Sequence, residues 1–239
     1  MEYIGKQNLE IMEEMAPFYN RFLANQFKTI FKESGARSHD HILDFGAGIG
    51  SIAVELKQLG FDNVDCLEVD SAMQQIMSTR NLPVYSNMND LPHLYPYVYL
   101  SNVLEHIEDD EALLRTICDE VMEESGILII YVPAFHLLFS ELDRQVGHFR
   151  RYRISSLSSV VESAGLVVLE RKYVDSLGFF FLIILKFLLK RNLSLTSNKT
   201  LLQIYDLIAF PISRFLDRLG LSKCFGKNIL LVASRKTSL

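Results

Sequence analysis

The chain has 239 residues, of which 49% are hydrophobic and 22% charged, with only 12 Gly and 6 Pro. This length and composition suffice for a sizeable hydrophobic core, which excludes a disordered chain and a collagen-like repeat. The three cysteines are too few and too scattered for a disulfide framework or a spaced metal site. We therefore expect buried thiols in a reducing cytosol and a cytoplasmic protein.

The net charge of −5 is unevenly distributed along the chain. Residues 1–170 carry 12 Lys+Arg against 26 Asp+Glu, whereas residues 171–239 carry 12 against 3. The basic part is also the most apolar, which favours contact with an anionic and apolar partner such as a phospholipid leaflet or a lipid-linked phosphate. The alternative is a core-packing segment with solvated lysines. The acidic remainder disfavours nucleic acid as a substrate.

The start of the chain lacks the basic and apolar regions of a secretory signal. The longest apolar run, Leu177 to Leu185, is shorter than the roughly 18 residues that a membrane span needs. We therefore predict no export and no membrane span, and we interpret this run as interfacial or buried.

Short apolar runs alternate with segments of helical periodicity along most of the chain. One or two helices are predicted at 6–35, followed by helices at 51–59, 71–79, 110–122 and 155–163. Strands are predicted at 41–45, 64–68, 83–85, 98–101, 127–132, 166–174 and 228–234. This alternation is typical of a parallel sheet that is covered by helices on both faces.

We divide the single predicted domain, 1–239, into four segments: helices at 1–38, a core at 39–174, an insertion at 175–226 and a last strand at 227–239. The insertion is far longer than the few residues that usually join two strands. It holds the apolar run and an amphipathic helix from Leu201 to Leu219 that Pro211 is expected to break.

A glycine turn follows the first predicted strand, in the string Asp44-Phe45-Gly46-Ala47-Gly48-Ile49-Gly50. Glycines let the main chain turn tightly and approach a ligand closely, and the helix that follows offers amide donors at its N-terminus. A dinucleotide-binding loop would need the spacing Gly-x-Gly-x-x-Gly, but here the third glycine comes one residue earlier. A nicotinamide oxidoreductase is therefore disfavoured.

This loop resembles the cofactor loop of the class I S-adenosylmethionine-dependent methyltransferases. The resemblance covers about residues 40–174 and the closing strand. It implies an α/β fold, namely a Rossmann-like doubly wound sheet of seven strands, mostly parallel with an antiparallel last strand. It also implies an enzyme with S-adenosylmethionine as cofactor. Glu68, 18 residues after Gly50, matches the family's ribose-binding acid, and Asp70 is expected to cap the next helix.

Further residues match the family's cofactor contacts in order. Asn87 replaces the usual acid at the adenine, so an amide would make that contact, and Met88 would flank the ring or serve only as core. Asn102 and Leu104 lie where the family's loop faces the methionine end of the cofactor. The complete set of expected cofactor residues is Asp44, Gly46, Ala47, Gly48, Gly50, Glu68, Val69, Asn87, Met88, Asn102 and Leu104.

The pair Glu105-His106 belongs to a Glu-x-x-Glu-His pattern that holds a divalent metal in some quinone-pathway O-methyltransferases. Here Asn102 stands in place of the first Glu. We therefore expect no metal site, and we interpret Glu105 and His106 as a solvated helix start.

The string Gly147-His148-Phe149-Arg150-Arg151-Tyr152 resembles a lid motif in a bacterial subset of these methyltransferases. His148 is the candidate general base, because imidazole titrates near neutrality. Arg150 and Arg151 are candidates for holding a substrate phosphate or carboxylate, and Tyr152 for contacting substrate. The alternatives are that His148 only pins the next helix and that the arginines pair with acidic residues.

The sequence therefore predicts a methyltransferase that methylates an oxygen of a small or lipid-linked acceptor near the inner membrane surface. The competing roles for the insertion are peripheral membrane contact through residues 177–219, a tunnel for a long apolar substrate, a homodimer interface and a helical cap over the sheet edge. A non-catalytic protein that binds the cofactor or a membrane partner is the alternative function.

Overall fold

The computed structural model of the protein describes residues 4–187 and 199–235. Two helices precede the sheet, α1 (Ile4–Met15) and α2 (Pro17–Glu33), as the sequence predicts for residues 6–35. Pro17 occupies the first turn of α2, where its missing N–H leaves no helical hydrogen bond unmade.

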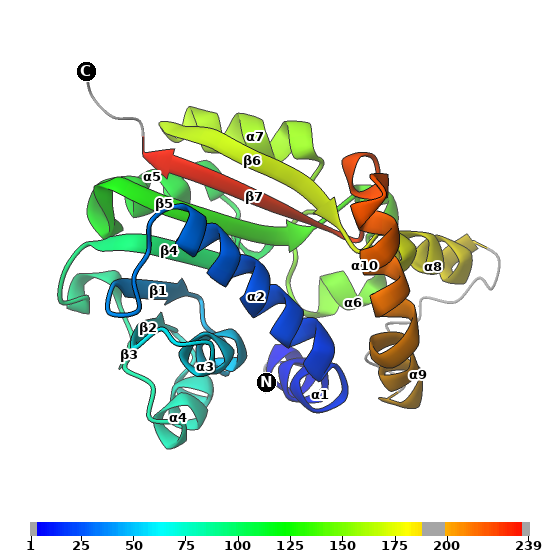
Figure 1. The fold of residues 1–239 in the computed structure, drawn as a ribbon, viewed down its shortest axis with the longest axis horizontal. Helices are drawn as coiled ribbons and strands as arrows, with labels where there is room; N and C mark the ends of the chain where they lie inside the picture. Colours follow the sequence, from blue (N-terminus) through cyan, green and yellow to red (C-terminus); the bar gives the residue numbers. More distant parts are fainter. Residues whose placement is uncertain (1–3, 188–198, 236–239) are drawn as a thin grey trace.

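A sheet of seven strands forms the centre of the molecule (Figure 1). The strands are β1 (His41–Phe45), β2 (Asn63–Leu67), β3 (Val84–Tyr85), β4 (Tyr95–Ser101), β5 (Met122–Pro133), β6 (Leu166–Val174) and β7 (Asn228–Arg235). Their order is β3-β2-β1-β4-β5-β7-β6, and β7 runs antiparallel to both of its neighbours. The predicted Rossmann-like fold with an antiparallel last strand is confirmed.

Helices cover both faces of this sheet, as Figure 1 shows. The helices that connect the strands from β1 to β6 are α3 (Ser51–Gln58), α4 (Ser71–Thr79), α5 (Asp110–Thr116), α6 (Glu141–Gln145) and α7 (Ile154–Ser163). One buried cluster joins the sheet to α2 and α3, and a second joins it to α5 and α7. Because both faces are covered, the central strands are apolar throughout instead of alternating.

Two details of the sheet differ from the sequence-based expectation. Helix α5 ends at Thr116 and continues as a π-helical turn, Ile117–Val121, so that β5 begins at Met122 within the predicted helix. The last two strands were both expected at an edge, but β7 lies between β5 and β6. Burial of β7 on both sides explains its unbroken apolar run from Ile229 to Ala233.

The insertion forms α8 (Ser176–Phe187), α9 (Lys199–Ile204), a π-helical turn Tyr205–Ala209 and α10 (Phe210–Arg218). The expected break at Pro211 is wrong, because the helical conformation is continuous from α9 to α10. The π turn directly before Pro211 widens the helix where a proline ring would clash with the carbonyl one turn earlier.

Two carboxylates of the insertion hold it together and fasten it to α2. Asp206 accepts hydrogen bonds of 2.9 Å from the amides of Phe18 and Tyr19, in the first turn of α2. Asp217 accepts from the amides of Asp175 and Ser176 at the start of α8. A carboxylate at a helix N-terminus satisfies orphan amides and complements the helix dipole. The insertion is thus built into the fold and packs against α1 and α2.

None of the described helices combines the length and the hydropathy that crossing a bilayer requires. The apolar run Leu177 to Leu185 lies within α8, and residues 188–198, which follow that helix, lie outside the described residues.

Candidate active site

The glycine turn lies where β1 ends and α3 begins, at the carboxyl edge of the parallel strands. Gly46 and Gly48 both have positive φ angles, 76° and 58°, which L side chains rarely adopt. A Cβ atom at Gly46 would lie 2.5 Å from Cγ2 of Val103, and one at Gly48 would lie 2.8 Å from Cδ1 of Leu9. The turn therefore requires bare main chain, since the loop after β4 and helix α1 both approach it closely.

Glu68 fixes the shape of this turn from the end of β2. One carboxylate oxygen accepts the Gly48 amide at 2.8 Å, and the other accepts the Asp70 amide at 2.9 Å. Each carboxylate oxygen has a further lone pair that remains available for a hydroxyl group. Asp70 caps α4 by accepting from the amides of Ala72 and Met73, as expected. The next residue after Glu68, Val69, is largely exposed beside the turn.

Asp44, the last polar residue before the turn, is almost completely buried. Burial raises the pKa of its carboxyl to about 7, and the nearby Glu68 carboxylate adds to the rise. Perturbed pKa values of this kind cluster at functional sites. Ala47 donates its amide to the Leu67 carbonyl, and Gly50 forms the left-handed N-cap of α3, so the whole turn is held in one conformation.

The residues expected at the adenine lie after β3, next to β2. Asn87 is exposed and donates its side-chain amide to Asp90 at 3.1 Å. Met88 begins a short 3₁₀ turn and packs partly against the core. Asn102 is exposed after β4 with a positive φ of 55°, whereas Leu104 is fully buried. The structure therefore places the cofactor candidates in the four loops that follow β1, β2, β3 and β4, at one edge of the sheet.

His148 reaches the same edge from the segment that follows β5. Its Nδ1 atom lies 2.7 Å from Oδ1 of Asp143, and its Nε2 atom lies 3.9 Å from Oε1 of Glu105. The ring of His148 meets the ring of His106 edge to face, with centroids 4.5 Å apart. Glu105 and His106 belong to the same loop as Val103, so His148 lies one loop away from the glycine turn.

The comparisons with known proteins agree with this geometry. Residues 9–171 match the family model described as "Methyltransferase domain". The chain belongs to this methyltransferase family. Its membership and strand order confirm an enzyme of the class I type that uses S-adenosylmethionine. The residues fit this cofactor, because the turn presents main chain without side chains and Glu68 offers carboxylate oxygens beside it.

Solved structures with the same fold include a SAM-dependent methyltransferase from Archaeoglobus fulgidus. It is 16% identical to the chain with a TM-score of 0.58, covering 90% of this chain and 94% of that one. The plantazolicin methyltransferase BpumL in complex with SAH is 12% identical with a TM-score of 0.61, covering 95% and 88%. Phosphoethanolamine N-methyltransferase 2 from Haemonchus contortus, in complex with S-adenosyl-L-methionine, is 17% identical with a TM-score of 0.55, covering 88% and 52%. Identities this low support the fold alone. No curated protein matches the sequence.

The three expected substrate residues, Arg150, Arg151 and Tyr152, form contacts with other residues of the protein. Arg151 donates two hydrogen bonds to Asp143, at 2.9 and 3.0 Å. Arg150 donates to the Glu108 carbonyl and pairs with Asp110 at 2.8 Å. Tyr152 is buried, and its hydroxyl donates to Asp110 at 2.7 Å. The arginines thus follow the alternative of pairing with acidic residues, and their binding of substrate stays a prediction.

The expectation that Glu105 lies at a solvated helix start is wrong. Its side chain is fully buried, and neither carboxylate oxygen has a hydrogen-bond partner among residues 4–187 and 199–235. Burial raises the pKa of Glu105 to about 8 and, together with His148, lowers the pKa of His106 to about 4. The segment that carries His148 contacts this loop, since the Phe149 amide donates to the Glu105 carbonyl.

The segment after β5 also supplies a third potential metal ligand, His148, which the local sequence pattern does not reveal. One ligand atom each from Glu105, His106 and His148 lie within 4.8 Å of one another. The loop after β4 holds only two of the three, and His148 joins them from more than 40 residues later in the chain. No local pattern could reveal this grouping, and the expected lack of a metal at this site stays a prediction.

Proposed function

We propose that the methyltransferase transfers its methyl group to a hydroxyl oxygen of an amphiphilic acceptor, with His148 as general base. The observation that carries this proposal is the hydrogen-bonded pair of Asp143 and His148 beside the cofactor loops. When bound, S-adenosylmethionine supplies a methyl group that its sulfonium already activates. The protein then has to align the acceptor and remove the hydroxyl proton.

The tautomer of His148 suits that role. Asp143 accepts a hydrogen bond from Nδ1, which leaves the Nε2 lone pair free to take a proton. Burial favours a neutral Asp143, but hydrogen bonds from His148 and Arg151 outweigh it and lower the pKa of Asp143 below its usual range. The carboxylate is therefore ionised at neutral pH, and it stabilises the imidazolium that forms when His148 accepts the proton.

An apolar cleft supports an acceptor with a hydrocarbon part. It has a volume of about 230 Å³ and lies between α8 and the helix that begins with α9. Its lining includes Phe180, Phe181, Ile184 and Leu201. Lys186 of α8 donates hydrogen bonds of 2.7 Å to the carbonyls of Leu137 and Phe139, so the cleft helices are tied to the segment that leads to His148.

The outer face of the insertion supports membrane contact as part of the same proposal. Exposed apolar side chains are gathered on the π turn and α10, namely Leu207, Ile208, Ile212, Phe215 and Leu219. Arg218 is exposed beside them, whereas Lys186 is engaged by carbonyls and Arg214 lies over the ring of Phe22. An exposed apolar face with basic residues is suited to an anionic lipid surface.

The exposed apolar face of the π turn and α10 is also compatible with two alternatives from the sequence analysis, a homodimer and a non-catalytic interaction protein. A second copy of the chain would cover it in a homodimer, and a protein partner would cover it if the protein were non-catalytic. A molecular mass in solution equal to that of the monomer would contradict the homodimer. Turnover of an acceptor would contradict a non-catalytic protein.

Methyl transfer to a panel of acceptors tests the proposed reaction. The full chain is incubated with S-adenosylmethionine and paired hydroxyl and amine acceptors whose acyl chains increase in length, and the products are identified by mass spectrometry. We expect methylation of hydroxyl acceptors, increasing with acyl-chain length. Preferential methylation of the amines, or equal rates with and without the acyl chain, would contradict the proposal.

A further inference from the structure

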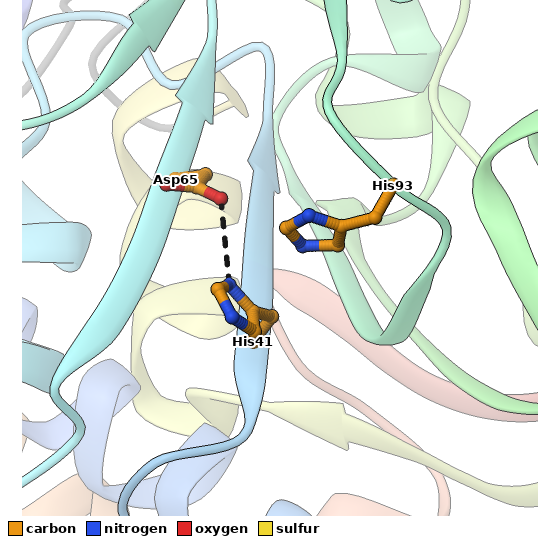
Figure 2. Close-up of side chains that lie close together, drawn as sticks. All are labelled: His41, Asp65 and His93. Carbon is orange, nitrogen blue, oxygen red and sulfur yellow. Dashed lines mark ion pairs between the residues drawn. The ribbon is translucent and has the colours of Figure 1, made fainter.

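Two histidines and one aspartate meet at the end of the sheet opposite the glycine turn. His41 is the first residue of β1, Asp65 lies in the middle of β2, and His93 precedes β4. Figure 2 shows the two imidazoles and the carboxylate facing one another across β1. The glycine turn follows the last residue of β1, so the length of this strand, about 13 Å, separates the turn from His41.

The distances between these side chains are close to those of a metal-binding site. Nδ1 of His41 lies 3.8 Å from Oδ2 of Asp65, and the rings of His41 and His93 have centroids 4.2 Å apart. One ligand atom from each residue falls within 4.8 Å of the others. Ligands of a tetrahedral ion with bonds of 2.0–2.1 Å lie about 3.3 Å apart, so small side-chain rotations suffice.

The present contacts leave polar atoms of this cluster without partners. Nδ1 of His41 and Nε2 of His93 are buried, and neither is hydrogen-bonded within the described part of the chain. The 3.8 Å separation of His41 and Asp65 is too long for a hydrogen bond. Buried polar atoms without partners are uncommon in folded proteins and often mark a bound ion or water.

The chemistry of the three groups fits a borderline transition-metal ion. The imidazole nitrogens of His41 and His93 that lack a hydrogen-bond partner in the described part of the chain can each offer a lone pair to such an ion. Tyr95 donates a hydrogen bond of 2.9 Å to Oδ2 of Asp65 and so orients the carboxylate. Metal-ligating carboxylates usually have such a second hydrogen-bond partner.

We propose that His41, Asp65 and His93 form a binding site for a Zn²⁺-type ion, with water as the fourth ligand. Two imidazoles and one carboxylate are a ligand set that zinc accepts and that magnesium disfavours. The ion would join β1, β2 and the segment before β4. Because the site lies at the other end of β1 from the glycine turn, its role is to stabilise the sheet and not to take part in methyl transfer.

Zinc titration of the chelator-treated full chain tests this site. We expect binding with a melting temperature that rises with zinc concentration, and no comparable effect of magnesium. His41→Ala and His93→Ala should each weaken binding by at least about 10-fold. Matched controls are His39→Ala, which removes an exposed histidine near the site, and His106→Ala, which alters the other histidine cluster. Both controls should retain the binding event that His93→Ala loses.

His93→Gln, which is polar and similar in size, provides a second variant if His93→Ala does not fold, as judged by circular dichroism. Shifts of the His41 and His93 imidazole resonances on zinc addition would identify the ligands directly. The proposal is overturned if the full chain takes up no zinc, if the His41 and His93 variants bind as tightly as the parent, or if only His106→Ala loses binding.

Discussion

Nδ1 of His148 lies 2.7 Å from Oδ1 of Asp143, and this contact leaves Nε2 as the free nitrogen of the imidazole. Asp143 is itself held by the two hydrogen bonds from Arg151 and by Ser140 of the capping box at the start of α6. Arg151 therefore helps to fix Asp143, the residue that orients His148.

His148→Ala is expected to reduce kcat for methyl transfer by about 10²–10⁴-fold, because it removes the proposed general base. The dissociation constant for S-adenosylhomocysteine, measured by isothermal titration calorimetry, should stay unchanged. His136→Ala is the matched control, since His136 is an exposed histidine of the same segment. Equal loss of kcat in both variants, or no loss in either, would show that His148 does not act as the base.

Glu68→Ala is expected to weaken binding of S-adenosylhomocysteine by about 10–100-fold. It removes the carboxylate proposed for the ribose and also the hydrogen bond that holds the Gly48 amide. Asp70→Ala is the control, because Asp70 caps α4 two residues later and its loss should lower stability by about 1 kcal/mol without weakening binding. Unchanged affinity in Glu68→Ala would remove the assigned cofactor site.

Glu105→Gln is expected to stabilise the protein at pH 7.5 and to leave its stability unchanged near pH 4. The pKa of Glu105 is raised to about 8 in the folded protein, against 4.5 for the ordinary side chain. The contribution of Glu105 to stability is therefore complete below pH 4.5, and it is lost progressively as the pH rises from 4.5 through about 8. The neutral amide avoids this loss, worth about 2–4 kcal/mol at pH 7.5.

Denaturant unfolding of both proteins at several pH values measures this difference. Glu111→Gln serves as the control, because it neutralises a less buried glutamate of α5 that pairs with Arg115. Parallel stability curves for Glu105→Gln and the parent protein across this pH range would contradict the assigned burial effect.

Phe215→Ser and Leu219→Ser, combined, are expected to release the protein from anionic vesicles. Phe215 of α10 is 61% exposed and Leu219, directly after α10, is 66% exposed. Inserting each into a lipid interface should contribute about 1.5 kcal/mol. Leu169→Ser is the matched control, since Leu169 is a similarly exposed apolar residue on β6, outside the insertion. Co-sedimentation measures retention, and failure of the parent protein to sediment with anionic vesicles would exclude membrane contact.

Asp206→Ala is expected to destabilise the protein by about 2–4 kcal/mol, because two amides at the start of α2 lose their buried, charge-assisted acceptor. The melting temperature should fall by several degrees. Asp62→Ala, at an exposed position before β2, is the control and should have little effect. Equal melting temperatures of Asp206→Ala and the parent would show that the insertion is only loosely attached.

The sequence alone determined the order of strands and helices in the core and the position of the glycine turn. These features follow from local signals, namely apolar runs of strand length and glycines at Gly46, Gly48 and Gly50. Element ends were less well predicted, as at Met122, because the π turn after α5 depends on packing and not on local propensity.

Which distant side chains meet depends on the three-dimensional fold and could not be predicted from local patterns. The fold joined His148 to Glu105, His41 to His93, and Asp206 to the start of α2, each across a separation that no periodic pattern records. It also buried Glu105, which the run of acidic residues after it had made appear solvated. Tertiary packing determines which side chains are buried and which lie close together. Burial and proximity in turn determine the pKa values, the ion pairs and the groups of potential ligands on which the chemistry depends.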